Sequence, residues 1–169
     1  AHADNFSFTG SFTQDDNVQL FNFSVGSPST VTLQTFSYAG GTNSTGTAIS
    51  RGGFDPILAL FNATTGAFIG QNDDGDVVPI DITRQGWDTL LSTSLAAGNY
   101  TVAVMQFNNF AVGPNLSNGF VQQGQGNFTP SLSQNQCTQG RFVDVSGSSP
   151  NNCRDGHWAF DILNVNSAT

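Results

Sequence analysis

The sequence predicts an all-β protein, an antiparallel β-sandwich or jelly roll formed as a single domain by residues 1–169. Short segments in which apolar and polar residues alternate are separated by turn residues, as expected for half-buried strands. All 12 acidic residues are Asp and all four basic residues are Arg, so the chain lacks the Glu and Lys that usually cover helices. The 15 Phe residues supply enough apolar side chain for a folded core.

Eight segments have the pattern of strands. In residues 5–12, Phe6, Phe8 and Phe12 occupy even positions with small polar residues between most of them, which indicates a half-buried strand. The run 57–61 is apolar throughout and is expected to be a central strand buried on both faces. It should form a hairpin with the strand after the turn at 63–66. The other expected strands are 18–25, 30–38, 67–70, 90–95, 99–107 and 158–165.

One long polar stretch, residues 108–152, interrupts this pattern and is here called the insertion. Connections of more than about 15 residues are uncommon and are usually functional or disordered. We expect the insertion to be an excursion over the surface of the sandwich. Two interpretations stay open, a contact surface for a partner and an inert loop.

The two cysteines, Cys137 and Cys153, predict a disulfide that staples the end of the insertion. Such a bond contributes about 3 kcal/mol by closing a loop of this size, and it forms in oxidising compartments. Zinc binding with His157 is the alternative, but structural zinc sites usually contain close C-x-x-C pairs and four ligands. The start Ala1-His2-Ala3 resembles the end of a signal peptide. Both features predict a secreted, extracellular or cell-surface protein.

The charge distribution limits the classes of partner. The formal net charge is −8 and the four Arg residues are scattered along the chain, whereas a nucleic-acid surface needs clustered basic residues. No run approaches the roughly 18 apolar residues of a membrane span. We therefore expect neither nucleic acid as a partner nor a membrane-spanning segment.

An acidic cluster follows the central hairpin. Asn72, Asp73, Asp74 and Asp76 surround Gly75 and offer several oxygen ligands at short range, as calcium requires. An EF-hand is excluded, because a glycine stands at its first acidic position and no flanking helices are expected. An Asp-Gly turn without a metal is the alternative interpretation.

Further aspartates lie in turns next to other predicted strands. Asp55 precedes the buried run, Asp88 precedes the strand 90–95, and Asp16 precedes the strand 18–25. If these turns gather at one end of a sandwich, their charges repel unless a cation compensates them. The sequence therefore predicts a calcium site with these ligands: Asp16, Asp55, Asn72, Asp73, Asp74, Asp76 and Asp88.

Catalytic signals are few. No nucleophile elbow occurs, no H-E-x-x-H motif is present, and His157 is the only histidine in the expected folded body. We therefore predict that the chain is not an enzyme. Trp87, in a turn, is the candidate for a contact with glycans.

Three segments resemble a known family. They are DNVQLFNFSV, GGFDPILALFNATTGAFIGQNDDGD and LAAGNYTVAV, and they are similar to bacterial pre-peptidase C-terminal domains. The similarity is closer still to a group of secreted β-sandwich proteins associated with PEP-CTERM sorting. The resemblance implies a jelly-roll-like sandwich, export and frequent calcium binding, with Asp55, Asp73, Asp74 and Asp88 at acidic positions of the family. The insertion is a departure from that pattern.

These inferences combine into one functional prediction. We expect a secreted calcium-binding structural protein, a self-associating subunit of an extracellular fibre, sheath or matrix. Strand edges that pair with a neighbouring copy would supply the contact as a homo-oligomer or filament. The alternative is a calcium-dependent accessory module that binds carbohydrate or matrix.

Overall fold

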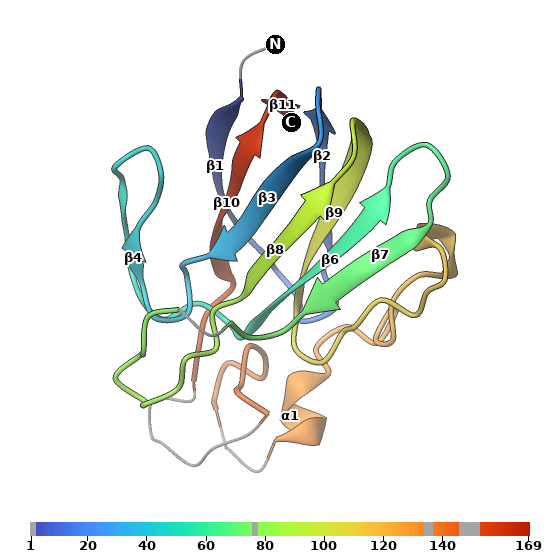
Figure 1. The fold of residues 1–169 in the computed structure, drawn as a ribbon. Coiled ribbons are helices and arrows are strands. Elements are labelled where there is room, and N and C mark those ends of the chain that lie inside the picture. The colour runs from blue at the N-terminus through green and yellow to red at the C-terminus, as the bar shows by residue number, and fades with distance from the viewer. Residues whose placement is uncertain (1–2, 76–77, 134–136, 146–152) are drawn as a thin grey trace.

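The computed structural model confirms the antiparallel β-sandwich (Figure 1). The structure describes residues 3–75, 78–133, 137–145 and 153–169. Ala1, His2 and Asp76 lie outside this part of the chain, as do portions of the insertion. The first sheet contains four strands in the order β1 (Asp4–Ser11), β10 (His157–Val165), β3 (Ser29–Thr35) and β8 (Leu90–Leu95).

The second sheet contains five strands. Their order is β11 (Ser167–Ala168), β2 (Gln19–Val25), β9 (Gly98–Gln106), β6 (Pro56–Asn62) and β7 (Phe68–Asn72). The predicted hairpin is present, because β6 and β7 pair directly and Gly66 has a φ of 78° in the turn between them. The first and last long strands, β1 and β10, lie side by side in the first sheet.

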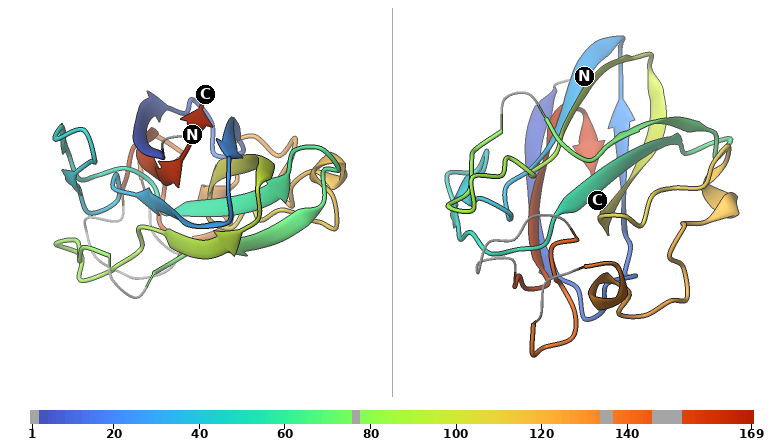
Figure 2. Two further views of the ribbon diagram at one scale, coloured as in Figure 1. Left: turned by 45° about the horizontal axis from the view of Figure 1, so that its top comes forward. Right: turned by 90° about the horizontal axis from the view of Figure 1, so that it is seen from below.

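Four short elements complete the structure. The strands β4 (Gly41–Thr42) and β5 (Ala48–Ile49) form a small hairpin that projects from the side of the sandwich (Figures 1 and 2). The insertion contains the 3₁₀ helix η1 (Leu116–Asn118) and the single turn α1 (Thr129–Leu132). In the described residues, no helix has the length and apolar character needed to cross a membrane.

The inner core fills the space between the two sheets. Leu58 and Leu60 of β6 and Val102 and Val104 of β9 point into it, where they meet Phe160 and its neighbours from the first sheet. The residues between them on β6 and β9 point to the opposite face. This alternation explains how one strand supplies apolar side chains to two cores.

The outer core lies on the far face of the second sheet. Ile57, Ala59 and Phe61 of β6 are fully buried there, together with Met105 of β9 and Ala111 of the insertion. The aromatic residues Phe107, Phe110 and Phe120 pack against this cluster. The prediction that the strand at residues 57–61 is buried on both faces is therefore confirmed. The second cover of this strand is the first part of the insertion, a structural role that neither interpretation of that segment included.

The insertion is tied to the sandwich at its far end as well. Figures 1 and 2 show its gold part beside β7 and its orange part near the ends of the strands. The buried carboxylate of Asp15 accepts hydrogen bonds from the Thr129 N–H at 2.9 Å, the Thr129 hydroxyl at 2.6 Å and the Phe142 N–H at 2.7 Å. The predicted disulfide joins Cys137 to Cys153, so zinc is not the role of these cysteines.

Candidate metal site

Asp55 is a buried carboxylate at the start of β6. Only 9% of the residue is exposed, and no hydrogen-bond donor among the described residues reaches its Oδ1. Its backbone carbonyl accepts the Phe107 N–H at 2.8 Å, which fixes the main chain beside β9. A buried carboxylate oxygen without a donor carries a large desolvation cost. The side chain therefore needs a compensating group that the described protein atoms do not supply.

The charges around Asp55 increase this need. Burial raises the pKa of the Asp55 carboxyl well above its usual value, and repulsion from other carboxylates raises it further. In decreasing order of effect, these carboxylates are Asp144, Asp74, Asp73 and Asp88. A proton or a cation removes such repulsion, and a divalent cation suits a group of several carboxylates.

The loop after β7 brings two of these charges close to the start of β8. The Asn72 side-chain amide donates to the Leu90 carbonyl at 2.8 Å, and the Leu90 N–H donates to the Asp74 carbonyl at 3.3 Å. A Cβ on Gly75 would lie 2.8 Å from that of Leu90, so only glycine fits this approach. Burial followed by repulsion from Asp73 raises the pKa of Asp74. The charges of Asp73 and Asp74 raise the pKa of Asp55, so this part of the predicted cluster acts on that residue. Asp76 lies outside the described residues.

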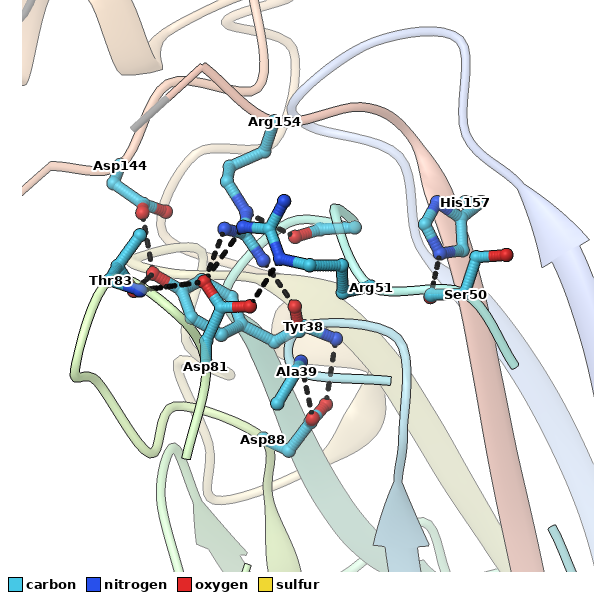
Figure 3. A network of polar contacts seen from close by, with 11 residues as sticks. Tyr38, Ala39, Ser50, Arg51, Asp81, Thr83, Asp88, Asp144, Arg154 and His157 are labelled. Carbon is cyan, nitrogen blue, oxygen red and sulfur yellow. Dashed lines mark hydrogen bonds and ion pairs between the residues drawn. The ribbon is translucent and has the colours of Figure 1, made fainter. Parts of the chain in front are cut away.

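Asp88 has a different environment from the one predicted. Its Oδ1 accepts the Thr35 hydroxyl at 2.9 Å. Its Oδ1 also accepts the Tyr38 N–H at 3.0 Å, and its Oδ2 accepts the Ala39 N–H at 2.9 Å (Figure 3). The side chain is fully buried. Because both oxygens already accept hydrogen bonds, Asp88 holds the chain that follows β3.

Asp16 is also occupied elsewhere. Its Oδ2 accepts the Gly126 N–H at 3.0 Å, and its N–H donates to the Gly126 carbonyl at 3.1 Å. Its charge is not among the main causes that raise the pKa of Asp55. The turn before β2 thus binds the insertion, and the structure does not bring Asp16 to the predicted rim site.

The described side chains do not by themselves form a cation site. Within the described ranges, no group of three or more His, Cys, Asp or Glu side chains is placed so that it could hold a metal ion. A second oxygen without a donor from the described residues, Oε1 of Gln106, is buried at the end of β9, where Gln106 lies opposite Pro56. A buried carboxylate oxygen without a donor among the described residues, such as Oδ1 of Asp55, suits a hard cation such as calcium.

A buried ion-pair network lies next to this site, and sequence reasoning missed it. Asp81 accepts from Nε of Arg51 at 2.6 Å and from a guanidinium nitrogen of Arg154 at 3.0 Å (Figure 3). The Arg154 guanidinium also lies 3.7 Å over the Tyr38 ring and donates to the Gly53 carbonyl at 2.8 Å. The one sequence feature that could have indicated this network is the position of Arg154 directly after Cys153.

His157 and Trp87 have partners that explain them structurally. The Nδ1 atom of His157 contacts Asp155, and its Nε2 lies 2.9 Å from the Ser50 carbonyl oxygen. This carbonyl is not a nucleophile, so the arrangement is not a Ser-His-Asp triad. Trp87 is half-buried, with its ring centroid 5.6 Å from that of Tyr38. Its contact with glycans stays a prediction.

Comparisons with known proteins show similarity at the level of structure. No protein-family model matches the sequence, and no curated protein matches it. Among solved structures, the chain is similar to the pre-peptidase C-terminal domain of collagenase from Bacillus anthracis, with 10% sequence identity and a TM-score of 0.42. The match covers 98% of this chain and 89% of that chain. That domain is of the kind that the three sequence segments resemble, and the PEP-CTERM association stays a prediction.

Proposed function

We propose that this chain is a secreted, calcium-binding structural domain without catalytic activity of its own. The observation that carries the proposal is Asp55, whose buried Oδ1 meets no donor from the described residues while neighbouring carboxylates repel it. Calcium accepts six to eight oxygen ligands in flexible geometry, whereas magnesium demands a near-ideal octahedron. Carboxylates that come from two separate segments are not expected to form a regular octahedron, so they favour calcium over magnesium.

The ion would bind Asp55 and draw toward it the oxygens of the loop after β7, where Asp73 and Asp74 lie. Calcium supplies two positive charges, which convert the repulsion between these side chains into attraction to a shared centre. The start of β6 and the loop after β7 would then be fixed to each other. The expected result is a more rigid and more stable domain, because the ion binds the folded state and not the unfolded chain.

Export is supported by the disulfide. Cys137 and Cys153 are paired, and such bonds form and persist mainly in oxidising environments outside the cytosol. Extracellular fluids also provide calcium at concentrations suited to weak sites, with dissociation constants on the order of 10⁻⁴ to 10⁻³ M.

Calorimetric titration of the metal-free protein tests the calcium site. The wild-type protein should bind calcium, and at 100 times the dissociation constant its stability should rise by about 2.7 kcal/mol. The Asp55→Asn variant should lose both responses, while Asp4→Asn, which removes the same charge from an exposed position of β1, should keep them. Absence of binding by the wild-type protein, or equal binding by Asp55→Asn, would contradict the proposal.

We further propose that the domain is a subunit of an extracellular fibre, sheath or matrix. This is supported by the edge strand β8, which contains no charged residue and no proline. Natural sheets usually protect an edge with such residues, because an open edge can pair with another chain. A second copy of this domain is the partner expected at β8.

Sedimentation velocity tests this association. Oligomers should form with calcium, and Ser94→Lys at the exposed edge of β8 should reduce them. Thr30→Lys is the matched control, because Thr30 is also exposed and lies opposite Ser94 on the interior strand β3. Only monomers with and without calcium, or equal loss of association in the two variants, would count against the proposal.

A further inference from the structure

The first sheet has two open edges, β1 and β8. In the second sheet the edge strand β7 is covered by the insertion, because the Phe68 N–H donates to the Pro114 carbonyl at 2.8 Å. Within the described ranges, no main-chain hydrogen bond of this kind reaches residues 5–11 of β1 from outside β10, or residues 91–95 of β8 from outside β3. These two segments also contain no charged residue and no proline. Both edges can therefore accept a strand from another chain.

The start of β8 shows which of its main-chain groups point to the free edge. The Leu90 N–H donates to the Asp74 carbonyl at 3.3 Å and so points away from β3. Because these groups alternate along an antiparallel strand, those of Ser92 and Ser94 also point to the free edge. Alternate side chains such as Leu95 point into the inner core, which leaves the two serine side chains on the outer face of the sheet.

The strand β1 has the same arrangement at the opposite edge. Directly after β1, the Phe12 N–H donates to the Gly156 carbonyl at 2.7 Å, toward the side of β10. Alternation therefore points the main-chain groups of Ser7 and Thr9 to the free edge. Phe8 lies between them and packs against the inner core, so the side chains of Ser7 and Thr9 also lie on the outer face.

The two edges match in direction and in face. Each neighbouring pair in the order β1, β10, β3, β8 is antiparallel (Figure 1), so β8 runs antiparallel to β1. A second copy in the same orientation beside β8 therefore presents its β1 as an antiparallel partner. Residues that oppose each other in a sheet lie on one face, and the residues with free main-chain groups lie on the outer face in both strands.

The inner side of both edges is apolar. Phe6 and Phe8 on β1 and Leu91 on β8 pack against the inner core but are only half-buried. Pairing of the two edges would continue the inner core from one copy to the next and withdraw these side chains from water. The hydrophobic gain adds to the main-chain hydrogen bonds of the new strand pair.

We propose that β8 of one copy pairs with β1 of the next, so that the first sheet continues from copy to copy in a head-to-tail assembly. This inference rests on the proposed role as a fibre subunit and names the edge that β8 meets. In the expected register, Ser94 lies opposite Ser7 and Ser92 lies opposite Thr9. A contact between two different surfaces repeats along a chain of copies, whereas two β8 strands that met about a two-fold axis would stop at a dimer.

Mixing of two single-edge variants is the first measurement. Thr9→Pro blocks β1 and Ser94→Pro blocks β8, because each removes an N–H that points to the free edge and spares the hydrogen bonds within the domain. In sedimentation velocity with calcium, each variant alone should be monomeric at concentrations at which the wild-type protein forms a series of oligomers. An equimolar mixture should form heterodimers and nothing larger, since one variant keeps β8 and the other keeps β1. Thermal unfolding of each variant checks that it is folded.

Amide hydrogen exchange of the wild-type protein is the second measurement and needs no substitution. Relative to the dilute monomer, the assembled protein should protect the amides of Ser7 and Thr9 on β1 and those of Ser92 and Ser94 on β8. Val31 on β3 is the control, because both neighbours of that strand belong to the same copy. Its exchange should be alike in the two states.

The outcomes separate this inference from the proposed function. If the wild-type protein stays monomeric, both the fibre role and this inference are wrong. If it associates while Thr9→Pro alone still forms dimers, or while the two folded variants form no heterodimer, the fibre role stands and the pairing of β8 with β1 is overturned. If either variant does not fold, the exchange of the wild-type protein decides, and protection of β8 without protection of β1 overturns the inference.

Discussion

Two aspartates show that the partners of a carboxylate decide its role. Burial acts to raise the pKa of Asp81, but hydrogen bonds from Arg51, Arg154 and Thr83 outweigh burial and hold that pKa well below its usual value. Burial also raises the pKa of Asp55, where further carboxylates add to the effect. Asp81 is therefore a compensated charge that stabilises the fold, whereas Asp55 is an uncompensated one that can attract a ligand.

Replacement of Asp81 should be strongly destabilising. Asp81→Asn removes the negative charge that pairs with the fully buried Arg154 guanidinium, and breaking a buried ion pair typically costs about 3 kcal/mol or more. Urea unfolding followed by circular dichroism measures the change. Asp155→Asn, whose side chain is 64% exposed, should change stability little, and an equal loss in the two variants would contradict the role of the buried network.

The low pKa of Asp81 also predicts acid sensitivity. The folded-state pKa lies below the unfolded value of about 3.9, so the stabilisation is complete above that value and is lost as the pH falls below it. In chelator, the difference in unfolding free energy between wild type and Asp81→Asn should therefore shrink progressively below about pH 4. Parallel curves for the two proteins between pH 2 and 7 would show that Asp81 titrates alike in both states.

At the level of elements, alternation predicted the long strands and failed for the short ones. The segment 57–61 was identified by its continuous apolar residues, and 90–95 matches the bounds of β8. The two-residue strands β4, β5 and β11 contain too few positions for a periodic pattern. The insertion was expected to be surface because it is rich in amides and glycine, yet its few aromatic residues, such as Phe110 and Phe120, are placed to cover a sheet.

Sequence context does not separate aspartates of the candidate site from aspartates with other roles. Asp73, Asp74 and Asp55 were predicted as ligands because each follows or precedes an apolar strand, and that role stays a prediction. Asp88 and Asp16 have the same sequence context but are bound by main-chain N–H groups, which no sequence pattern reveals. The buried Asp144, which accepts the Tyr38 hydroxyl, was not predicted, although an Asp between two valines is a sign of a buried polar group.

The packing of β1 against β10 gives a prediction at the level of two strands. A Cβ on Gly10 would lie 2.3 Å from Cζ2 of Trp158, and that ring is itself enclosed by Phe12 and Phe21. Gly10→Ala should therefore destabilise the protein by about 2 kcal/mol through overpacking. In Gly70→Ala, on β7, the new Cβ would have no heavy atom within 4 Å, so that variant should be neutral or up to about 1 kcal/mol more stable.

Thermal unfolding of both glycine variants checks this contrast. The difference between them matters more than either value, since both replace glycine by alanine in a strand. If Gly10→Ala were as stable as Gly70→Ala, the indole of Trp158 would have room to move, and the inner core would be less tightly packed at β1 than the described contacts imply.

At the level of the whole molecule, the insertion is attached to the sandwich at several points. The insertion covers the outer core, its middle is bound by Asp15, and its end is closed by the disulfide. Phe142 extends this union, because it belongs to the insertion and yet packs in the inner core. The chain therefore uses its least regular segment to connect both of its cores.

The disulfide tests how far this union depends on a covalent bond. Cys137 and Cys153 are 16 residues apart, and opening a loop of that size should lower the unfolding free energy by about 3 kcal/mol. The Cys137→Ser/Cys153→Ser variant should show this loss in urea, and the wild-type protein in reductant should match it. Because hydrogen bonds to Asp15 still hold Thr129 and Phe142, one cooperative transition should remain. Two separate transitions would mean that the disulfide alone joins the insertion to the sandwich.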